Sequence, residues 1–149
     1  MTRPLESTRG YDFADGTGQI IGAALEAHRE LGPGFQEVVY QRVLAMEMDA
    51  AGLEFGREEW IPVFYKGRKI DTRRVDFVVG DCLVEIKARA ELLDQDIIQT
   101  LSYLKASGYR VALLLNFGAK KLEIKRLVND RHCEAAAAHT EHEKERTKI

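Results

Sequence analysis

The sequence predicts an α/β fold, in which a mixed β-sheet is flanked by helices and the elements follow the order ααβββαββ. Three observations lead to this prediction. Apolar residues recur at helical spacing in the first third of the chain, strand-like runs begin after Gly52, and one more helical stretch over 94–107 interrupts those runs. The domain is expected over residues 16–129, after a lead-in over 1–15 that has no periodicity.

Two helices are expected first. One spans about 18–31, with Thr17 as its N-cap, and ends where Gly32-Pro33-Gly34 breaks the helical pattern. The other spans about 36–51. It stops at Gly52, because glycine readily adopts the left-handed conformation that follows many helices.

Three strands follow the two helices. Leu53–Tyr65 is the first, and Pro62 within it indicates an edge strand or an irregularity, because proline cannot donate to a ladder. After a turn at Lys66–Arg68, the second and third strands are Ile70–Val79 and Cys82–Ala88.

A helix and two strands complete the domain. The helix spans Asp94–Ser107 and ends at Gly108, and it precedes the apolar run Val111–Phe117, which predicts a strand covered on both faces. Leu122–Val128 is the last strand. Residues 130–149 carry alternating charges without a large apolar face, and a frayed helix or a disordered tail is expected there.

Composition excludes several classes of protein. The 149 residues are 45% hydrophobic and 31% charged, which excludes a wholly disordered chain. The longest uninterrupted apolar run, Val111–Leu115, is far shorter than the ~20 residues of a membrane helix, so no membrane partner is expected. Cys82 and Cys133, the only cysteines, support neither a disulfide framework nor a zinc site, and a reducing, cytoplasmic location is expected.

The net charge of −2 excludes a protein held on nucleic acid by bulk positive charge, but it leaves room for local basic surfaces. Two basic clusters are present, and each is either such a surface or solubilising charge on an exposed hairpin. They consist of Lys66, Arg68, Lys69, Arg73 and Arg74, and of Lys120, Lys121, Lys125 and Arg126.

Asp76 and Glu85 form the most informative pair of residues. Gly80-Asp81 is a good two-residue hairpin loop, and with it Asp76 is predicted directly opposite Glu85, with Lys87 on the same face. Two opposed carboxylates repel each other, so the pair breaks the local rules of an otherwise apolar hairpin. The pair is either a functional site or part of a surface-facing side of the hairpin with an ordinary Lys–carboxylate pair.

A bound divalent cation would remove this conflict. Mg²⁺, with Mn²⁺ as its substitute, takes oxygen ligands and is commonly held by one or two carboxylates together with water and substrate phosphate. Lys87 would then orient or activate the attacking water, or stabilise negative charge in the transition state.

Asp76 together with Glu85-Ile86-Lys87 resembles the D…(D/E)-x-K signature of the PD-(D/E)XK phosphodiesterase superfamily, with Val75 in place of the proline. Gly34-Phe-Gln-Glu37-Val-Val-Tyr40 resembles the motif that names the GxxExxY family, a bacterial branch of that superfamily. Three further segments are also similar to the family pattern: His28–Gly34, Tyr65–Gly67 and Leu114–Gly118. The resemblance covers about residues 17–129 and implies a restriction-endonuclease-like core.

The resemblance also implies roles for single residues. Metal ligands would be Asp76, Glu85 and the backbone carbonyl of Ile86, with Glu37 as a third carboxylate or an outer ligand acting through water. The implied catalytic residues are Lys87, Glu85, Asp76 and Glu37. Without such a role, Glu37 is a glutamate favoured by the helix dipole.

Gln99 and Tyr103, four residues apart, resemble a pair that orients the site or contacts the substrate strand in one branch of the superfamily. The alternative is that Tyr103 belongs to the core. His28 lies on an apolar helix face, where a histidine is either a site residue or a hydrogen-bonded core residue. The strand aromatics Trp60, Phe64 and Tyr65 either stack on bases or, more commonly, pack.

The leading hypothesis is a Mg²⁺-dependent phosphodiesterase that acts on nucleic acid by attack of a metal-activated water. DNA is the expected substrate, ahead of RNA. The alternative is a nucleic-acid-binding or protein-interaction module that retains the site without turnover. A carboxylate enzyme acting on a small phosphorylated substrate is a third reading. A small nuclease often gains affinity as a homodimer or through a protein partner.

Overall fold

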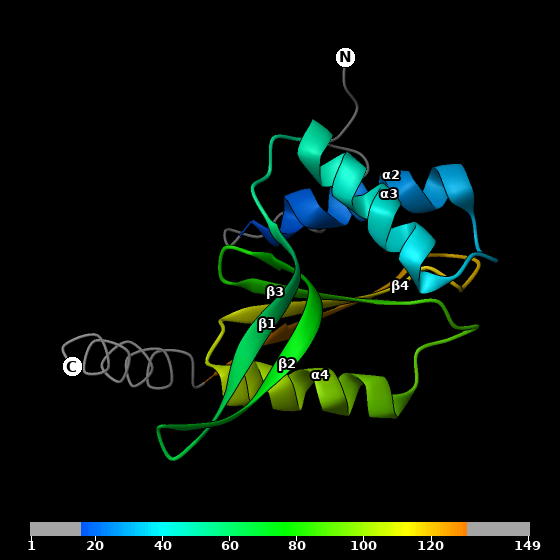
Figure 1. Cartoon of the computed structure of the whole chain (residues 1–149). Helices are drawn as coiled ribbons and strands as arrows, with labels where there is room; N and C mark the ends of the chain where they lie inside the picture. Colours follow the sequence, from blue (N-terminus) through cyan, green and yellow to red (C-terminus); the bar gives the residue numbers. More distant parts are fainter. Residues whose placement is uncertain (1–15, 131–149) are drawn as a thin grey trace.

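The computed structural model describes residues 16–130, which form three helices and a five-stranded sheet in the predicted order (Figure 1). The lead-in over 1–15 and the tail beyond Asp130, including Cys133, lie outside the described residues. Within the described part, no helix has the length and apolar character needed to cross a membrane.

Helix α2 spans Thr17–Leu31 and helix α3 spans Glu37–Ala50. The prediction of Thr17 as N-cap is wrong, because the cap is Gly16, whose φ of 84° suits glycine, and Thr17 is buried inside the helix. The predicted end of α3 is confirmed. Gly52 has a φ of 77°, and its N–H donates to the Asp49 carbonyl. The Leu53 N–H then donates to the Met48 carbonyl.

The sheet has the spatial order β1-β2-β3-β4-β5. The strands are β1 Gly56–Tyr65, β2 Arg68–Val79, β3 Cys82–Lys87, β4 Val111–Asn116 and β5 Glu123–Val128. Only β3 and β4 are parallel, and helix α4, Asp94–Ser107, connects them, so the sheet is mixed as predicted. Pro62 lies on the edge strand β1, and the β1–β2 register slips one residue later, between Val63 and Phe64.

Helices α2 and α3 cover one face of the sheet, and α4 covers the other (Figure 1). Phe77, Val84 and Ile86 belong to the core shared with α2 and α3. Leu83 packs with Leu104 of α4 in the second core. Strand β4 is buried along its whole length, which confirms the strand predicted to be covered on both faces.

Candidate active site

The β2–β3 hairpin opens at the two carboxylates. The predicted register holds at its closed end, where Val79 pairs with Cys82, but the ladder ends at the pair Phe77–Val84. The Asp76 N–H donates instead to Glu85 Oε1 at 3.1 Å, and the Ile86 N–H donates to Asp76 Oδ2 at 2.7 Å. Asp76 was predicted directly opposite Glu85, but the two residues are not Cα partners. Each carboxylate replaces a ladder bond by binding the backbone of the opposite strand.

Asp76 is held from α3 as well. Its Oδ1 accepts a hydrogen bond of 2.7 Å from Gln41 Nε2, and Gln41 Oε1 accepts one of 2.9 Å from Arg57 Nε. Arginine can only donate, so the Gln41 amide must turn its nitrogen toward Asp76. Position 76 therefore faces a donor on each side, Gln41 and the Ile86 N–H, and an ionised carboxylate accepts from both.

Glu85 is bound by Arg73 of β2. The guanidinium nitrogen lies 2.9 Å from Glu85 Oε2, and the same guanidinium lies over the Tyr103 ring of α4, 4.3 Å from the ring centroid. Tyr103, predicted as a site-orienting residue, thus reaches Glu85 through Arg73. Glu85 itself is only 7% exposed.

Burial raises the pKa of the Glu85 carboxyl above its ordinary value, and the charge of Asp76 raises it further. Arg73 and the Asp76 N–H oppose the rise by stabilising the charged form. The two acids are thus close enough to interact electrostatically, and the protein provides one cation to offset them.

This shift predicts the direction of a pH dependence. Because the pKa of Glu85 is higher in the folded than in the unfolded state, its favourable contribution to stability is present below the unfolded pKa and is lost as the pH rises through the folded one. Urea unfolding in EDTA, from acidic to neutral pH, should show wild type losing stability relative to Glu85→Gln over that window. The exposed Glu54→Gln is the control, and an unchanging difference between wild type and Glu85→Gln would contradict the prediction.

Lys87 is the last residue of β3 and lies two residues beyond Glu85. Alternation along the strand places both side chains on the α4 side, which they share with Leu83. The side chain is half-buried, and within residues 16–130 its amine takes part in no hydrogen bond or ion pair. The structure therefore leaves this ammonium available to a ligand beside the carboxylates.

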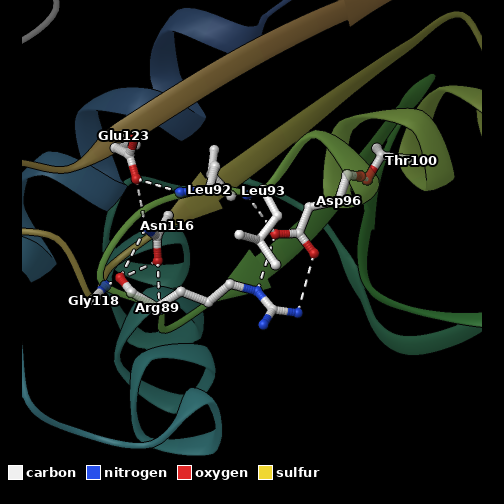
Figure 2. Close-up of polar contacts among 8 residues, drawn as sticks. All are labelled: Arg89, Leu92, Leu93, Asp96, Thr100, Asn116, Gly118 and Glu123. Atoms are coloured by element: carbon white, nitrogen blue, oxygen red, sulfur yellow. Dashed lines mark hydrogen bonds and ion pairs between the residues drawn. The ribbon is translucent and has the colours of Figure 1, made fainter.

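The segment that follows Lys87 is fixed by Asn116, which pairs with Lys87 at the end of β4. Figure 2 shows the contacts of Asn116 with this segment. The buried Asn116 amide accepts from the Arg89 N–H at 2.9 Å and donates to the Arg89 carbonyl at 3.0 Å. It also donates to Glu123 Oε1 at 2.7 Å, and this oxygen accepts the Leu92 N–H as well. The chain after the E-x-K strand is thus bound to β4 and β5.

The same segment is attached to α4. Arg89 Nε lies 3.0 Å from Asp96 Oδ2, and Asp96 also accepts the Leu93 N–H at the start of the helix (Figure 2). Gly118 completes the arrangement. A Cβ at this position would lie 2.5 Å from the Ala88 carbonyl carbon, so only glycine allows the loop after β4 to approach so closely.

The other predicted site residues lie apart from the carboxylates. Glu37 is the first residue of α3 and is exposed, although it lies on the same helix face as the buried Tyr40 and Leu44. Gln99 lies one turn before Tyr103 on α4 and is half-buried. His28 Nε2 donates to the Ala119 carbonyl oxygen at 2.9 Å, and His28 lines a separate cavity of about 460 Å³ between α2 and the loop before β5.

Sequence reasoning missed Gln41 and the contact role of Arg73. Gln41 carried a signal, because it is a polar residue flanked by the buried Tyr40 on a helix with Leu44 and Met48 on the same covered side. Arg73 gave no such signal, since it is one of five basic residues in a short stretch. Only the folded structure distinguishes it, as the one of the five that is half-buried.

Asp76 and Glu85 fit a divalent cation in their chemistry. They supply oxygen ligands, and each bound oxygen has a second lone pair. Within residues 16–130, no group of three or more His, Cys, Asp or Glu side chains is placed to hold an ion, so Glu37 does not complete a three-carboxylate cluster. The donor set fits an ion held by two carboxylates, and the remaining prediction for Glu37 is an outer ligand acting through water.

Comparison with known proteins agrees with this geometry. The sequence model described as PD-(D/E)XK nuclease superfamily matches residues 14–127. The match includes both carboxylates, Lys87, Asn116 and all of the sheet but the last residue of β5. No curated protein and no solved structure gives a significant match.

Proposed function

Because the chain belongs to the PD-(D/E)XK nuclease superfamily, we propose that it is a divalent-metal-dependent nuclease that hydrolyses phosphodiester bonds in nucleic acid. The proposed substrate is DNA rather than RNA. The observation that carries the proposal is the mutual placement of Asp76 and Glu85, each bound to the other strand's backbone. Lys87, two residues after Glu85 on β3, has an amine with no polar partner within residues 16–130. The motif from Gly34 to Tyr40 supports the finer assignment to the GxxExxY family.

Asp76 and Glu85 would hold Mg²⁺, or Mn²⁺ as its substitute, with help from the Ile86 carbonyl and from Glu37 through water. When bound, the ion supplies Lewis-acid polarisation of a phosphate oxygen and of the attacking water. Gln41 and the Ile86 N–H keep Asp76 in place for this role, and Arg73 does the same for Glu85.

Lys87 would act on the reacting groups directly. Its ammonium donates to a non-bridging phosphate oxygen or to the attacking water and stabilises the charge that develops as the new P–O bond forms. The old P–O ester bond breaks, and the leaving oxygen takes up a proton. Tyr103 positions Glu85 through Arg73, and Gln99, one turn earlier on α4, would contact the substrate strand.

A cleavage assay tests the proposal. Single-stranded, duplex and branched DNA and RNA are incubated with the protein in Mg²⁺, Mn²⁺ or EDTA, beside an Asp76→Ala control purified in parallel. Cleavage by wild type in either ion, with none in EDTA or with the variant, is expected. Cleavage that persists in Asp76→Ala would mean that the activity does not come from this site.

A binding module without turnover is the second candidate, and one observation favours it. Arg73 already binds the buried Glu85, and the described part of the chain offers no third acid to the ion. In that case nucleic acid binds equally well in EDTA and in Mg²⁺, and no product forms on any substrate.

A further inference from the structure

Residues 60–74 form a two-stranded arm that extends from the site. The hairpin of β1 and β2 reaches past α4 in Figure 1, and its tip is a two-residue turn in which Lys66 and Gly67 both have positive φ, 49° and 77°. Arg73, at the base of the arm, is the residue that binds Glu85. Asp76 follows on the same strand, so the arm begins at the site and extends about 26 Å from Asp76 to Arg68.

The arm carries three exposed apolar side chains. Trp60 is 64%, Tyr65 is 59% and Ile70 is 65% exposed. The common alternative for strand aromatics, packing into a core, therefore does not apply to Trp60 and Tyr65. Each of them is paired across the hairpin with an arginine, Trp60 with Arg74 and Tyr65 with Arg68.

The arm is also strongly basic. Lys66, Arg68, Lys69 and Arg74 are exposed, and none of them forms an ion pair with a residue of the described part of the chain. Lys66 Nζ lies over one face of the Tyr65 ring, 5.4 Å from its centroid, which leaves the other face for a base. The only acid of the arm, Asp71, uses Oδ1 to accept the Thr72 N–H. An arm with these positive charges and exposed aromatic rings complements a phosphate backbone that carries unstacked bases.

We propose that this arm binds an unpaired nucleic-acid strand, with Trp60 and Tyr65 stacking on bases and the four exposed cations of the arm contacting phosphates. The inference deepens the proposed function, since it assigns the part of the substrate next to the cleaved bond. An unpaired strand is favoured over a duplex because only unpaired bases offer their faces to an aromatic ring. Pairing of β1 with a second copy is disfavoured by Pro62 and by the charges along this edge.

The first test is binding of a fluorescent oligothymidylate in EDTA, followed by anisotropy. Trp60→Ala with Tyr65→Ala should weaken binding by about tenfold for each aromatic side chain and leave the salt slope unchanged. Arg68→Ala with Arg74→Ala should instead reduce the slope of log K against log[salt] by about 1.4, because each phosphate contact on a single strand contributes about 0.7.

Matched variants control for general effects. Met46→Ala with Val128→Ala removes exposed apolar surface elsewhere, and Lys105→Ala with Lys125→Ala removes two exposed cations. Both pairs should bind as wild type does. Equal losses in arm and control variants would overturn the proposal, and so would a duplex that binds as tightly as the single strand.

The second test uses Trp60 itself, which is the only tryptophan of the chain. Stacking on a base should quench its fluorescence as oligothymidylate is added, and quenching should saturate at the concentration where anisotropy does. Binding without quenching would overturn the role of Trp60. Sedimentation that shows wild type as a dimer and Trp60→Ala as a monomer would make the arm a subunit interface instead.

The arm and the nuclease can fail separately. If no substrate is cleaved but the arm variants lose binding, the inference about the arm is supported and the proposed nuclease activity is contradicted. If wild type cleaves single strands and the arm variants cleave them equally well at low substrate concentration, the arm inference fails and the nuclease stands.

Discussion

Asp76→Asn should lower divalent-dependent cleavage by more than about 100-fold, because a proposed metal ligand loses its charge. Losing only an outer partner of a metal ligand typically costs about 10- to 100-fold. It should also destabilise the fold. The structure places a donor on each side of position 76, from Gln41 and from Ile86, and an asparagine offers one acceptor and one donor. One of the two buried donors is then opposed by another donor, at a cost of about 1–3 kcal/mol.

A rotation of the Gln41 amide would not relieve this conflict, because it would turn the Gln41 nitrogen toward Arg57, which can only donate. Gln41→Leu should therefore recover part of the stability lost in Asp76→Asn, since it removes the opposing donor, without recovering cleavage. Urea unfolding of the two single variants and the double variant measures this coupling. Simple additivity of the two stability losses would contradict the hydrogen-bond arrangement around Asp76.

Cleavage must be compared where all variants are folded. Assays well below the unfolding midpoint of the least stable variant, with far-UV circular dichroism on the same samples, separate a lost ligand from a lost fold. The matched control is Gln41→Leu alone, which removes a donor to Asp76 but keeps both carboxylates. Asp76→Asn retaining more than about a tenth of wild-type cleavage would remove Asp76 from the metal site.

The sequence predicted the fold well, for physical reasons. Hydrophobic periodicity and the positions of glycine and proline are local properties of the sequence. The order of elements, the loop at Gly80-Asp81 and the buried strand β4 could therefore be predicted from them. The N-cap at Thr17 could not, because Gly16 adopts a positive φ that takes over the cap, and the Thr17 hydroxyl accepts from Arg126, 109 residues away. Capping here depends on tertiary structure.

The candidate site was only partly predictable, because its carboxylates break the ladder that was used to find them. Register arithmetic brought Asp76 close to Glu85, but it could not show that each binds the other strand's backbone. Contacts from other elements were harder still. Gln41 reaches Asp76 from helix α3, and Arg73 reaches Glu85 from the neighbouring strand β2. Glu37, one turn before Gln41, is exposed at the start of its helix.

Lys87 separates catalysis from binding. In a nuclease its amine acts on the reacting groups. It adds little to metal affinity, because the ammonium and the metal ion are both positively charged. Lys87→Ala should then lower cleavage by about 100-fold or more, the scale of losing one electrostatic stabiliser. It should leave the Mg²⁺-dependent rise in melting temperature, which comes from binding to the folded state, nearly unchanged.

Lys87→Arg gives the sharper comparison, because it keeps the charge but changes the donor geometry and cannot give up a proton. A binding surface would accept this change, and its Lys87→Ala variant would lose only about 0.7 to 0.9 of salt slope, the value of one phosphate contact. A catalytic lysine would not accept it, because the planar guanidinium places its N–H donors differently from an ammonium and keeps its proton. We expect Lys87→Arg to cleave almost as poorly as Lys87→Ala while it binds substrate as wild type does. Wild-type cleavage in both variants would remove Lys87 from the mechanism and leave the two carboxylates as the only catalytic groups from β2 and β3.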